Sequence, residues 1–204
     1  MKLVGFAGKG RVGKTTAALD FCTWLIDNTL YTPVLLPFAQ PLKEAVSAAQ
    51  GYNTPEEYKN ARPDDYRMDC QFEGDRQRQL NASHWVNLWK DDVEAYMHVE
   101  YADDNRKYCI VIDDVRYLNE VQSLQDLGGT VVFVSHSSRV IEDHKGAWRN
   151  HPSEELANFV EKSLSNQKQM TLECPFNHLV VNDHENADVY REKLRLRYKE
   201  FLGE

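Results

Sequence analysis

One glycine-rich segment near the start of the chain, Gly8–Thr15, constrains the fold more than any other feature. Its eight residues fit the phosphate-binding pattern G-x-x-x-x-G-K-[ST]. The apolar run Leu3–Ala7 precedes it and is typical of a buried strand, and residues 14–28 carry apolar side chains at helical spacing. Because the pattern lies between a strand and a helix, the sequence predicts a loop that binds the phosphates of a nucleoside triphosphate.

The residue types in this loop suit that chemistry. Glycines allow consecutive backbone N–H groups to turn inward around a phosphate, and the N-terminus of the following helix adds partial positive charge. We expect Lys14 to bridge the β- and γ-phosphates and to be catalytic, and the Thr15 hydroxyl to ligate Mg²⁺. The predicted phosphate-binding residues are Gly8, Gly10, Arg11, Val12, Gly13, Lys14, Thr15 and Thr16.

Composition limits the class of protein. The 204 residues, 42% of them hydrophobic, suit one α/β domain with a sizeable core. No apolar stretch approaches the roughly 20 residues of a membrane helix, and an apolar strand at the very start leaves no room for a signal peptide. The net charge of -8 argues against a nucleic-acid-binding surface, and the four cysteines form no C-x-x-C pair. We therefore expect a cytoplasmic protein with neither nucleic acid nor membrane as a partner.

Apolar runs alternate with helical patterns along the chain. The five runs are Leu3–Ala7, Val34–Phe38, Cys109–Ile112, Thr130–Val134 and His178–Val181, and the helical patterns cover about 14–28, 41–50, 83–100, 117–127, 154–165 and 186–202. This alternation predicts an α/β fold of the P-loop NTPase type, with three α/β/α layers and a five-stranded parallel sheet. In such sheets ligands bind beyond the carboxyl ends of the strands. Two polar stretches, 51–82 and 136–153, are expected as mobile insertions in a single domain over residues 1–204.

Two carboxylates, Asp113 and Asp114, follow the third apolar run. A phosphoryl-transfer site needs an acidic group here to hold Mg²⁺, directly or through water. Asp113 directly follows the run and is the preferred candidate, with Asp114 and an ordinary loop or cap role kept as alternatives. Arg116 is a candidate catalytic residue that reaches the transferring phosphoryl group; the alternative is a salt bridge with Glu120 or Asp114.

The loop also permits a second reading. Lys9–Thr16 resembles the deviant pattern K-G-G-x-G-K-[ST]-T of ParA- and MinD-like ATPases, which bind DNA or membrane as dimers. Here Arg11 replaces the second glycine, and Asp113–Arg116 has no glycine in the position of a D-x-x-G-like switch. These two departures weaken the resemblance, and a switch ATPase stays as the alternative function.

Further segments resemble the phage-type deoxynucleoside monophosphate kinases, a branch of the P-loop nucleoside monophosphate kinases. In chain order they match the family patterns F-A-x-P-[LI]-K, x-x-W-V, D-x-R-x-x-x-E, G-[GA]-x-V, H-x-[ST]-E and N-[DN]. The matching segments are Phe38–Lys43, Ser83–Val86, Asp113–Glu120, Gly128–Val131, His151–Glu154 and Asn182–Asp183. Asp75–Ser83 departs from the family's R-x-L-x-Q-x-x-G-T, which leaves the base preference open.

The resemblance implies transfer of the ATP γ-phosphoryl group to a (deoxy)nucleoside monophosphate, with Mg²⁺ bound by Thr15 and Asp113. Dimerisation is an expectation at the family level. The implied substrate-binding residues are Phe38, Lys43, Arg76, Arg78, Trp85, Arg116 and Glu120. For Phe38 and Trp85 the role is to stack on a base, and core packing suits the spacing of Trp85 and Trp89 equally well. Segment 51–82 would lie on the acceptor side, and 136–153 would form a lid with Arg139 and Arg149.

Overall fold

The computed structural model describes residues 1–102, 107–136, 155–165, 175–183 and 186–204. The chain divides into two compact units. The first unit joins Met1–Pro37 to Glu100–Glu204 and contains the sheet, and the second unit, Phe38–Val99, is helical. The expectation of a single domain with two insertions stays a prediction.

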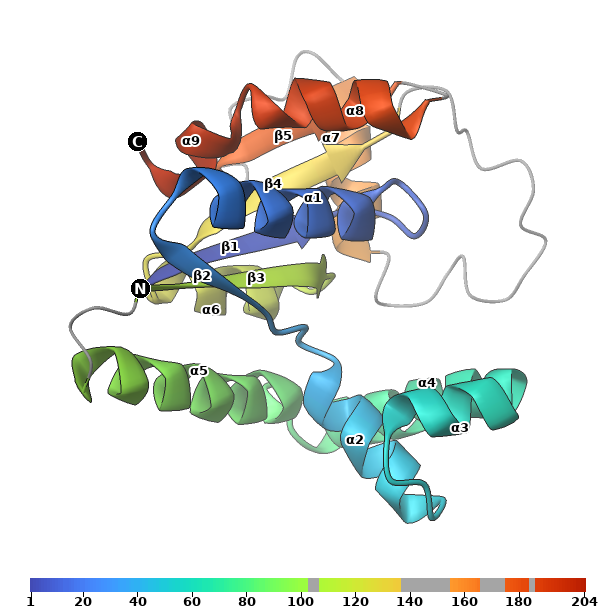
Figure 1. The fold of residues 1–204 in the computed structure, drawn as a ribbon. Coiled ribbons are helices and arrows are strands. Elements are labelled where there is room, and N and C mark those ends of the chain that lie inside the picture. The colour runs from blue at the N-terminus through green and yellow to red at the C-terminus, as the bar shows by residue number, and fades with distance from the viewer. Residues whose placement is uncertain (103–106, 137–154, 166–174, 184–185) are drawn as a thin grey trace. The chain divides into compact units, whose positions relative to one another are not determined.

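The first unit is built on a five-stranded, all-parallel sheet with the strand order β2-β3-β1-β4-β5 (Figure 1). The strands are β1 (Lys2–Ala7), β2 (Tyr31–Leu35), β3 (Lys107–Val115), β4 (Thr130–Ser135) and β5 (His178–Val181). In the central strand β1, Val4 lies opposite Val111 of β3 and Thr130 of β4. The predicted fold class is confirmed. The carboxyl ends of β1, β3 and β4 meet at one edge, where the loop after β1 also lies.

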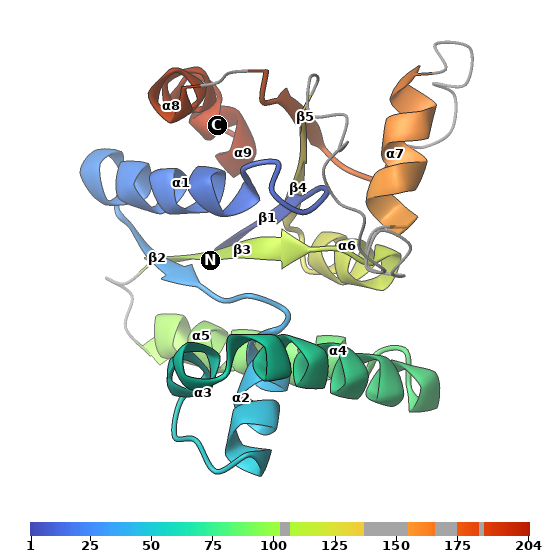
Figure 2. The same cartoon turned by 90° about the vertical axis from the view of Figure 1, so that its right-hand side faces the viewer.

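Helices cover both faces of this sheet (Figure 2). On one side lie α1 (Lys14–Asn28), α8 (Ala187–Arg195) and α9 (Tyr198–Leu202), and on the other α6 (Leu118–Asp126) and α7 (Glu155–Ser165). The core beneath α1 is aromatic: Phe6 of β1 packs edge-on against Phe21 of α1 and Phe201 of α9. Burial of these rings holds α1, and therefore the loop before it, firmly against the sheet.

Strand β2 lies three residues earlier than the sequence predicted. We expected Val34–Phe38, whereas the strand is Tyr31–Leu35 and includes Pro33 opposite Cys109. A proline removes a ladder donor and is tolerated in an edge strand, which is the position of β2 in the sheet. The predicted bounds of β2 were wrong because Pro33 argues against a strand unless the strand lies at an edge, and the residues of a strand do not show its position in the sheet.

The C-terminal helix predicted over 186–202 is divided into α8 and α9. The helix ends at Arg195, and the N–H of Arg197 donates to the carbonyl of Leu194, three residues earlier. The Arg197 guanidinium also donates to the carbonyl of Leu179 in β5, at 2.6 Å. This break redirects the chain so that Tyr198 and Phe201 enter the aromatic core.

The second unit consists of helices, including two that the sequence did not predict. Its helices are α2 (Gln40–Ala49), α3 (Pro55–Ala61), α4 (Pro63–Leu80) and α5 (His84–Ala102), the last ending just past its boundary. Segment 51–82, expected as a polar insertion, is mostly α3 and α4. A start signal was present, because Thr54 accepts from the N–H of Glu57 and the Glu57 carboxylate accepts from that of Asn53. No helix in the described part of the chain is long and apolar enough to cross a bilayer.

Candidate functional site

The loop between β1 and α1 has the backbone that its glycines predict. Three residues have φ in the left-handed region: Gly8 at 138°, Arg11 at 65° and Gly13 at 102°. A Cβ on Gly8 would lie 2.2 Å from the carbonyl oxygen of Val134 in β4, so only glycine fits there. The loop is therefore pressed against the end of the neighbouring strand.

Lys14 lies inside this loop. Its side chain is 7% exposed, and its Nζ donates to the carbonyl oxygens of Gly8 (2.8 Å) and Lys9 (2.6 Å). The ammonium group is thus held by the backbone that surrounds it, at the N-terminus of α1. A buried cation beside a helix N-terminus concentrates positive charge at one point, as an anion-binding loop requires.

Thr15 and Asp113 are in direct contact. The Thr15 Oγ1 donates to the Asp113 Oδ2 at 2.8 Å. The sequence predicted that the strand ends at Ile112, but β3 continues to Val115 and contains both aspartates. Between the pairs Gly5–Ile112 and Ala7–Val115, β3 holds one residue more than β1, which is a bulge at Asp113 and Asp114. Bulges redirect side chains, and of the two candidate acids it is Asp113 that meets Thr15.

Glu120 supports the segment that follows β3. Its side chain is buried, and Oε2 accepts from the backbone N–H groups of Arg116 (2.7 Å) and Tyr117 (3.0 Å). The carboxylate thus caps the start of α6 and holds the backbone of Arg116 in place. The role of Glu120 in substrate binding stays a prediction, as does the catalytic role of Arg116.

The two predicted aromatic substrate residues are packed inside the second unit. Phe38 is 2% exposed, with its ring centroid 4.2 Å from that of Trp89. Trp85 is also buried, and its indole N–H donates to the carbonyl of Gly74 at 3.3 Å. Of the two roles that the sequence left open for Trp85, the structure shows packing. Stacking on a base stays a prediction for both rings.

The predicted cationic substrate residues of the second unit lie on α2 and α4. Lys43 is half-buried in the first turns of α2. Arg76 donates twice to Glu73, at 2.7 and 2.8 Å, and this pairing lowers the pKa of Glu73 to about 2. Arg78 lies 3.9 Å from Asp75. The lid candidates Arg139 and Arg149, and the segment His151–Glu154, lie outside the described residues.

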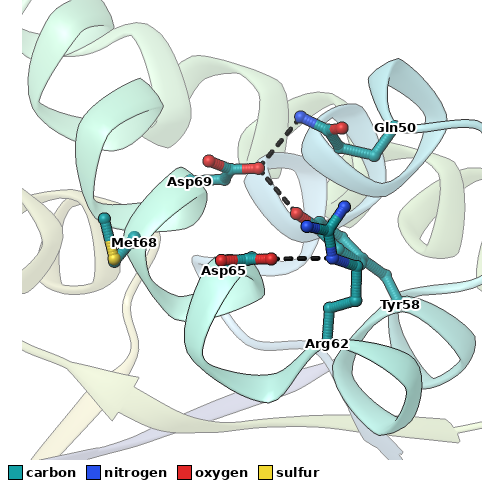
Figure 3. Close-up of a pocket in the computed structure, with 6 residues that line it drawn as sticks. All are labelled: Gln50, Tyr58, Arg62, Asp65, Met68 and Asp69. Atoms are coloured by element: carbon teal, nitrogen blue, oxygen red, sulfur yellow. Dashed lines mark hydrogen bonds and ion pairs between the residues drawn. The ribbon is translucent and has the colours of Figure 1, made fainter.

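A polar pocket of about 210 Å³ lies where α2, α3 and α4 meet (Figure 3). Asp69 accepts from Gln50 (2.9 Å) and from the Tyr58 hydroxyl (2.7 Å), and this second bond raises the pKa of Tyr58 to about 12. Arg62 pairs with Asp65 at 2.7 Å. Met68 completes the lining, which includes none of the predicted substrate residues. Its polar groups are therefore largely occupied by one another.

These features define a class. A glycine loop from β1 into α1, with a buried lysine and a threonine joined to an acid on the adjacent strand, is the arrangement of a P-loop protein with the three-layer kinase fold.

Comparison with known proteins narrows the class. No family model matches the chain. A protein of Acanthamoeba polyphaga mimivirus, named "Putative deoxynucleotide monophosphate kinase", is 31% identical over 170 residues, which cover 76% of this chain and 81% of the relative. The chain belongs to the deoxynucleotide monophosphate kinase family. This relationship supports a nucleotide kinase, and hence a phosphotransferase.

Proposed function

We propose that the protein transfers the γ-phosphoryl group of ATP to a (deoxy)nucleoside monophosphate and releases the nucleoside diphosphate. The observation that carries the proposal is the loop with Lys14 at its centre and the Thr15–Asp113 contact at its edge. Membership of the family supports the direction of transfer and the class of acceptor. Most of the catalysis in such a transfer comes from positioning and charge neutralisation.

The donor phosphates bind at the N-terminus of α1. The first N–H groups of a helix have no partner within the helix, and here they follow the left-handed Gly13. Lys14 exchanges its bonds to the Gly8 and Lys9 carbonyls for bonds to the β- and γ-phosphate oxygens. Both carbonyls belong to the same loop, so the ammonium lies beside the proposed phosphate site.

Thr15 and Asp113 would hold Mg²⁺. They offer one hydroxyl and one carboxylate, and the described residues contain no cluster of three or more His, Cys, Asp or Glu that could bind a metal by themselves. Two protein oxygens fit a Mg²⁺ whose other ligands are phosphate and water oxygens. When bound, the ion neutralises charge that develops on the phosphates. Because the Thr15 hydroxyl donates its hydrogen bond to Asp113, the lone pairs of the Thr15 oxygen are available to face a cation.

The acceptor phosphate is bound by cationic side chains, for which we propose Lys43, Arg76, Arg78 and Arg116. An acceptor phosphate is already anionic, so no general base is needed to activate it. Phe38 and Trp85, which are buried in the second unit, are proposed for the acceptor side as rings that stack on the base. Glu120 accepts from the backbone N–H of Arg116 and so holds that segment in place. The Arg76 guanidinium would have to leave Glu73 to reach a phosphate.

A panel assay tests the proposed function. Natural ribo- and deoxyribonucleoside monophosphates are each incubated with ATP, Mg²⁺ and the protein, and the diphosphates are quantified by ion-exchange chromatography. We expect turnover of at least one monophosphate and its loss on addition of EDTA. No turnover with any of them, together with ATP hydrolysis stimulated by DNA or anionic lipid vesicles, would contradict the proposal and favour the switch ATPase.

A further inference from the structure

The backbone of the loop between β1 and α1 accepts a hydrogen bond from Asn182, a residue far along the chain. Asn182 directly follows β5, and its backbone N–H donates to the carbonyl of Ser135 at 2.7 Å, which extends the pairing of β4 with β5. Its side-chain Nδ2 donates to the carbonyl of Val12 in the loop, at 2.9 Å. One residue therefore joins the edge of the sheet to the loop backbone.

Tyr190, on α8, packs against the same part of the loop. Its side chain is 2% exposed. A Cβ on Gly13 would lie 3.2 Å from the Tyr190 ring and 2.9 Å from the Asn182 amide nitrogen. Asn182 and Tyr190 thus leave no space behind Gly13, the residue that immediately precedes Lys14.

Two polar atoms at this contact have no hydrogen-bond partner in the described structure, the Asn182 Oδ1 and the Tyr190 hydroxyl. Burial raises the pKa of Tyr190, so the hydroxyl keeps its proton. Unpaired buried polar atoms reduce stability, so each of these two atoms carries a cost in the folded protein. For Asn182 the cost of the unpaired Oδ1 accompanies the bond that its Nδ2 donates to the Val12 carbonyl.

The direction of the Asn182 bond bears on the orientation of the loop backbone. In a trans peptide the C=O and the following N–H point in opposite directions. Because the Val12 carbonyl points at Asn182, the N–H of Gly13 points away from it. The bond from Asn182 thus sets the orientation of the Val12–Gly13 peptide group, which lies within the loop that would bind phosphate.

We propose that Asn182 and Tyr190 are positioning residues for the donor nucleotide. Asn182 orients the Val12–Gly13 peptide, and the Tyr190 ring prevents Gly13 from moving toward α8. Neither residue contacts the nucleotide or the reacting atoms. The inference rests on the proposed role of the loop in binding ATP.

Asn182→Ala tests the first half, with Asn186→Ala as its matched control. Asn186 lies four residues further on and caps α8, the helix of Tyr190, through a 2.8 Å bond from the N–H of Asp188, so its loss weakens that helix but removes no hydrogen bond to the loop. For Asn182→Ala we expect the Kd of ATP, measured by calorimetry without acceptor, and the KM of ATP to rise roughly tenfold. The KM of the acceptor should stay within about twofold. Asn186→Ala should lower Tm and raise the Kd of ATP much less than Asn182→Ala does.

Two tyrosine variants test the second half. Tyr190→Phe keeps the ring and removes the unpaired hydroxyl, so Tm should rise and ATP affinity should be retained. Tyr190→Ala opens space behind Gly13 and should weaken ATP binding. Equal weakening by both variants would overturn the role assigned to the ring.

An unchanged Kd of ATP in Asn182→Ala, or equal effects of Asn182→Ala and Asn186→Ala, would overturn the role assigned to Asn182. These results are separable from failure of the proposed function, in which the unmodified protein itself would bind no ATP.

Discussion

The hydroxyl of Thr15 donates a 2.8 Å hydrogen bond to the carboxylate of Asp113, which lies 98 positions further along the chain. Thr15 is in the first turn of α1, and Asp113 is near the end of β3. They meet because β1 and β3 are parallel neighbours, so the chain leaves both strands at the same edge of the sheet. The bulge in β3 then brings the first of the two aspartates to α1.

Asp113→Asn tests the proposed magnesium site. An asparagine can still accept from Thr15 but carries no charge for a cation, so kcat should fall by roughly 10²-fold and the Mg²⁺ concentration for half-maximal rate should rise. Asp114→Asn, which changes the neighbouring acid in the same way, is the control and should have a smaller effect on both. A magnesium titration of the initial rate measures this, and equal effects of the two variants would contradict the assignment to Asp113.

Lys14→Met tests the central cation. The methionine nearly matches the length of lysine but removes the ammonium, and phosphoryl transfer should fall by roughly 10³-fold or more. The carbonyls of Gly8 and Lys9 also lose a buried donor, so the free energy of unfolding should fall by about 1–2 kcal/mol. Turnover and urea unfolding are measured on the same preparation. Lys9→Met removes an equal charge from the loop as a control, and near-normal turnover of Lys14→Met would contradict the loop assignment.

Arg11→Gly tests the strain in the loop. Arg11 has φ of 65°, a conformation that costs a residue with a side chain about 1–2 kcal/mol. Glycine avoids this cost but loses more entropy on folding, by about 0.5–1 kcal/mol, so a net gain of up to about 1.5 kcal/mol is expected. Urea unfolding without nucleotide measures it. Arg11→Ala removes the same guanidinium and keeps the Cβ, so an equal change in both variants would show that strain is not the cause.

The carboxylate of Asp20 joins α1 to the C-terminal helices. Its side chain is 5% exposed and accepts two bonds from Arg195, at 2.7 and 3.1 Å, and one from the Tyr198 hydroxyl, at 2.9 Å. Asp20→Asn should lower the free energy of unfolding by about 3 kcal/mol, and Tyr198→Phe by about 1 kcal/mol.

The control for these two variants is an exposed ion pair on α8, Arg191 with Asp188, at 3.0 Å. Arg191→Ala should change the free energy of unfolding by no more than about 0.5 kcal/mol. Urea unfolding curves compare the three proteins, and a loss in Asp20→Asn no larger than that in Arg191→Ala would show that the buried pair contributes little.

His178 is expected to make the free energy of unfolding depend on pH. Burial and the nearby Arg197 lower the pKa of His178 from 6.5, so the unfolded chain binds a proton at a higher pH than the folded protein. The free energy of unfolding should therefore fall as the pH drops through about 6.5. His178→Asn should lose less stability between about pH 7.5 and 5.5 than the unmodified protein. Parallel pH profiles for the two proteins would exclude His178 as the source.

Local signals were sufficient for the elements of the sheet. The glycine pattern after Leu3–Ala7 and the alternation of apolar runs with helices correctly predicted a sheet of five parallel strands and the position of α1, although β2 lies three residues earlier than expected. The apolar pattern did not predict helices α3 and α4 because they bury few apolar residues; only α3 has a capping signal in its sequence, at Thr54. The family patterns agree with the relative found by comparison, although they leave the substrate open.

The sequence by itself determined the glycine-rich loop between the first strand and the first helix, with Lys14 in it, because the pattern depends on glycines and a lysine only a few residues apart. Only the tertiary structure decided that Thr15 donates to Asp113 and that the Asn182 amide donates to the Val12 carbonyl. Those contacts depend on which strands are neighbours, where β3 bulges and where β5 ends. Such relationships arise when distant segments pack together, and no spacing along the chain records them.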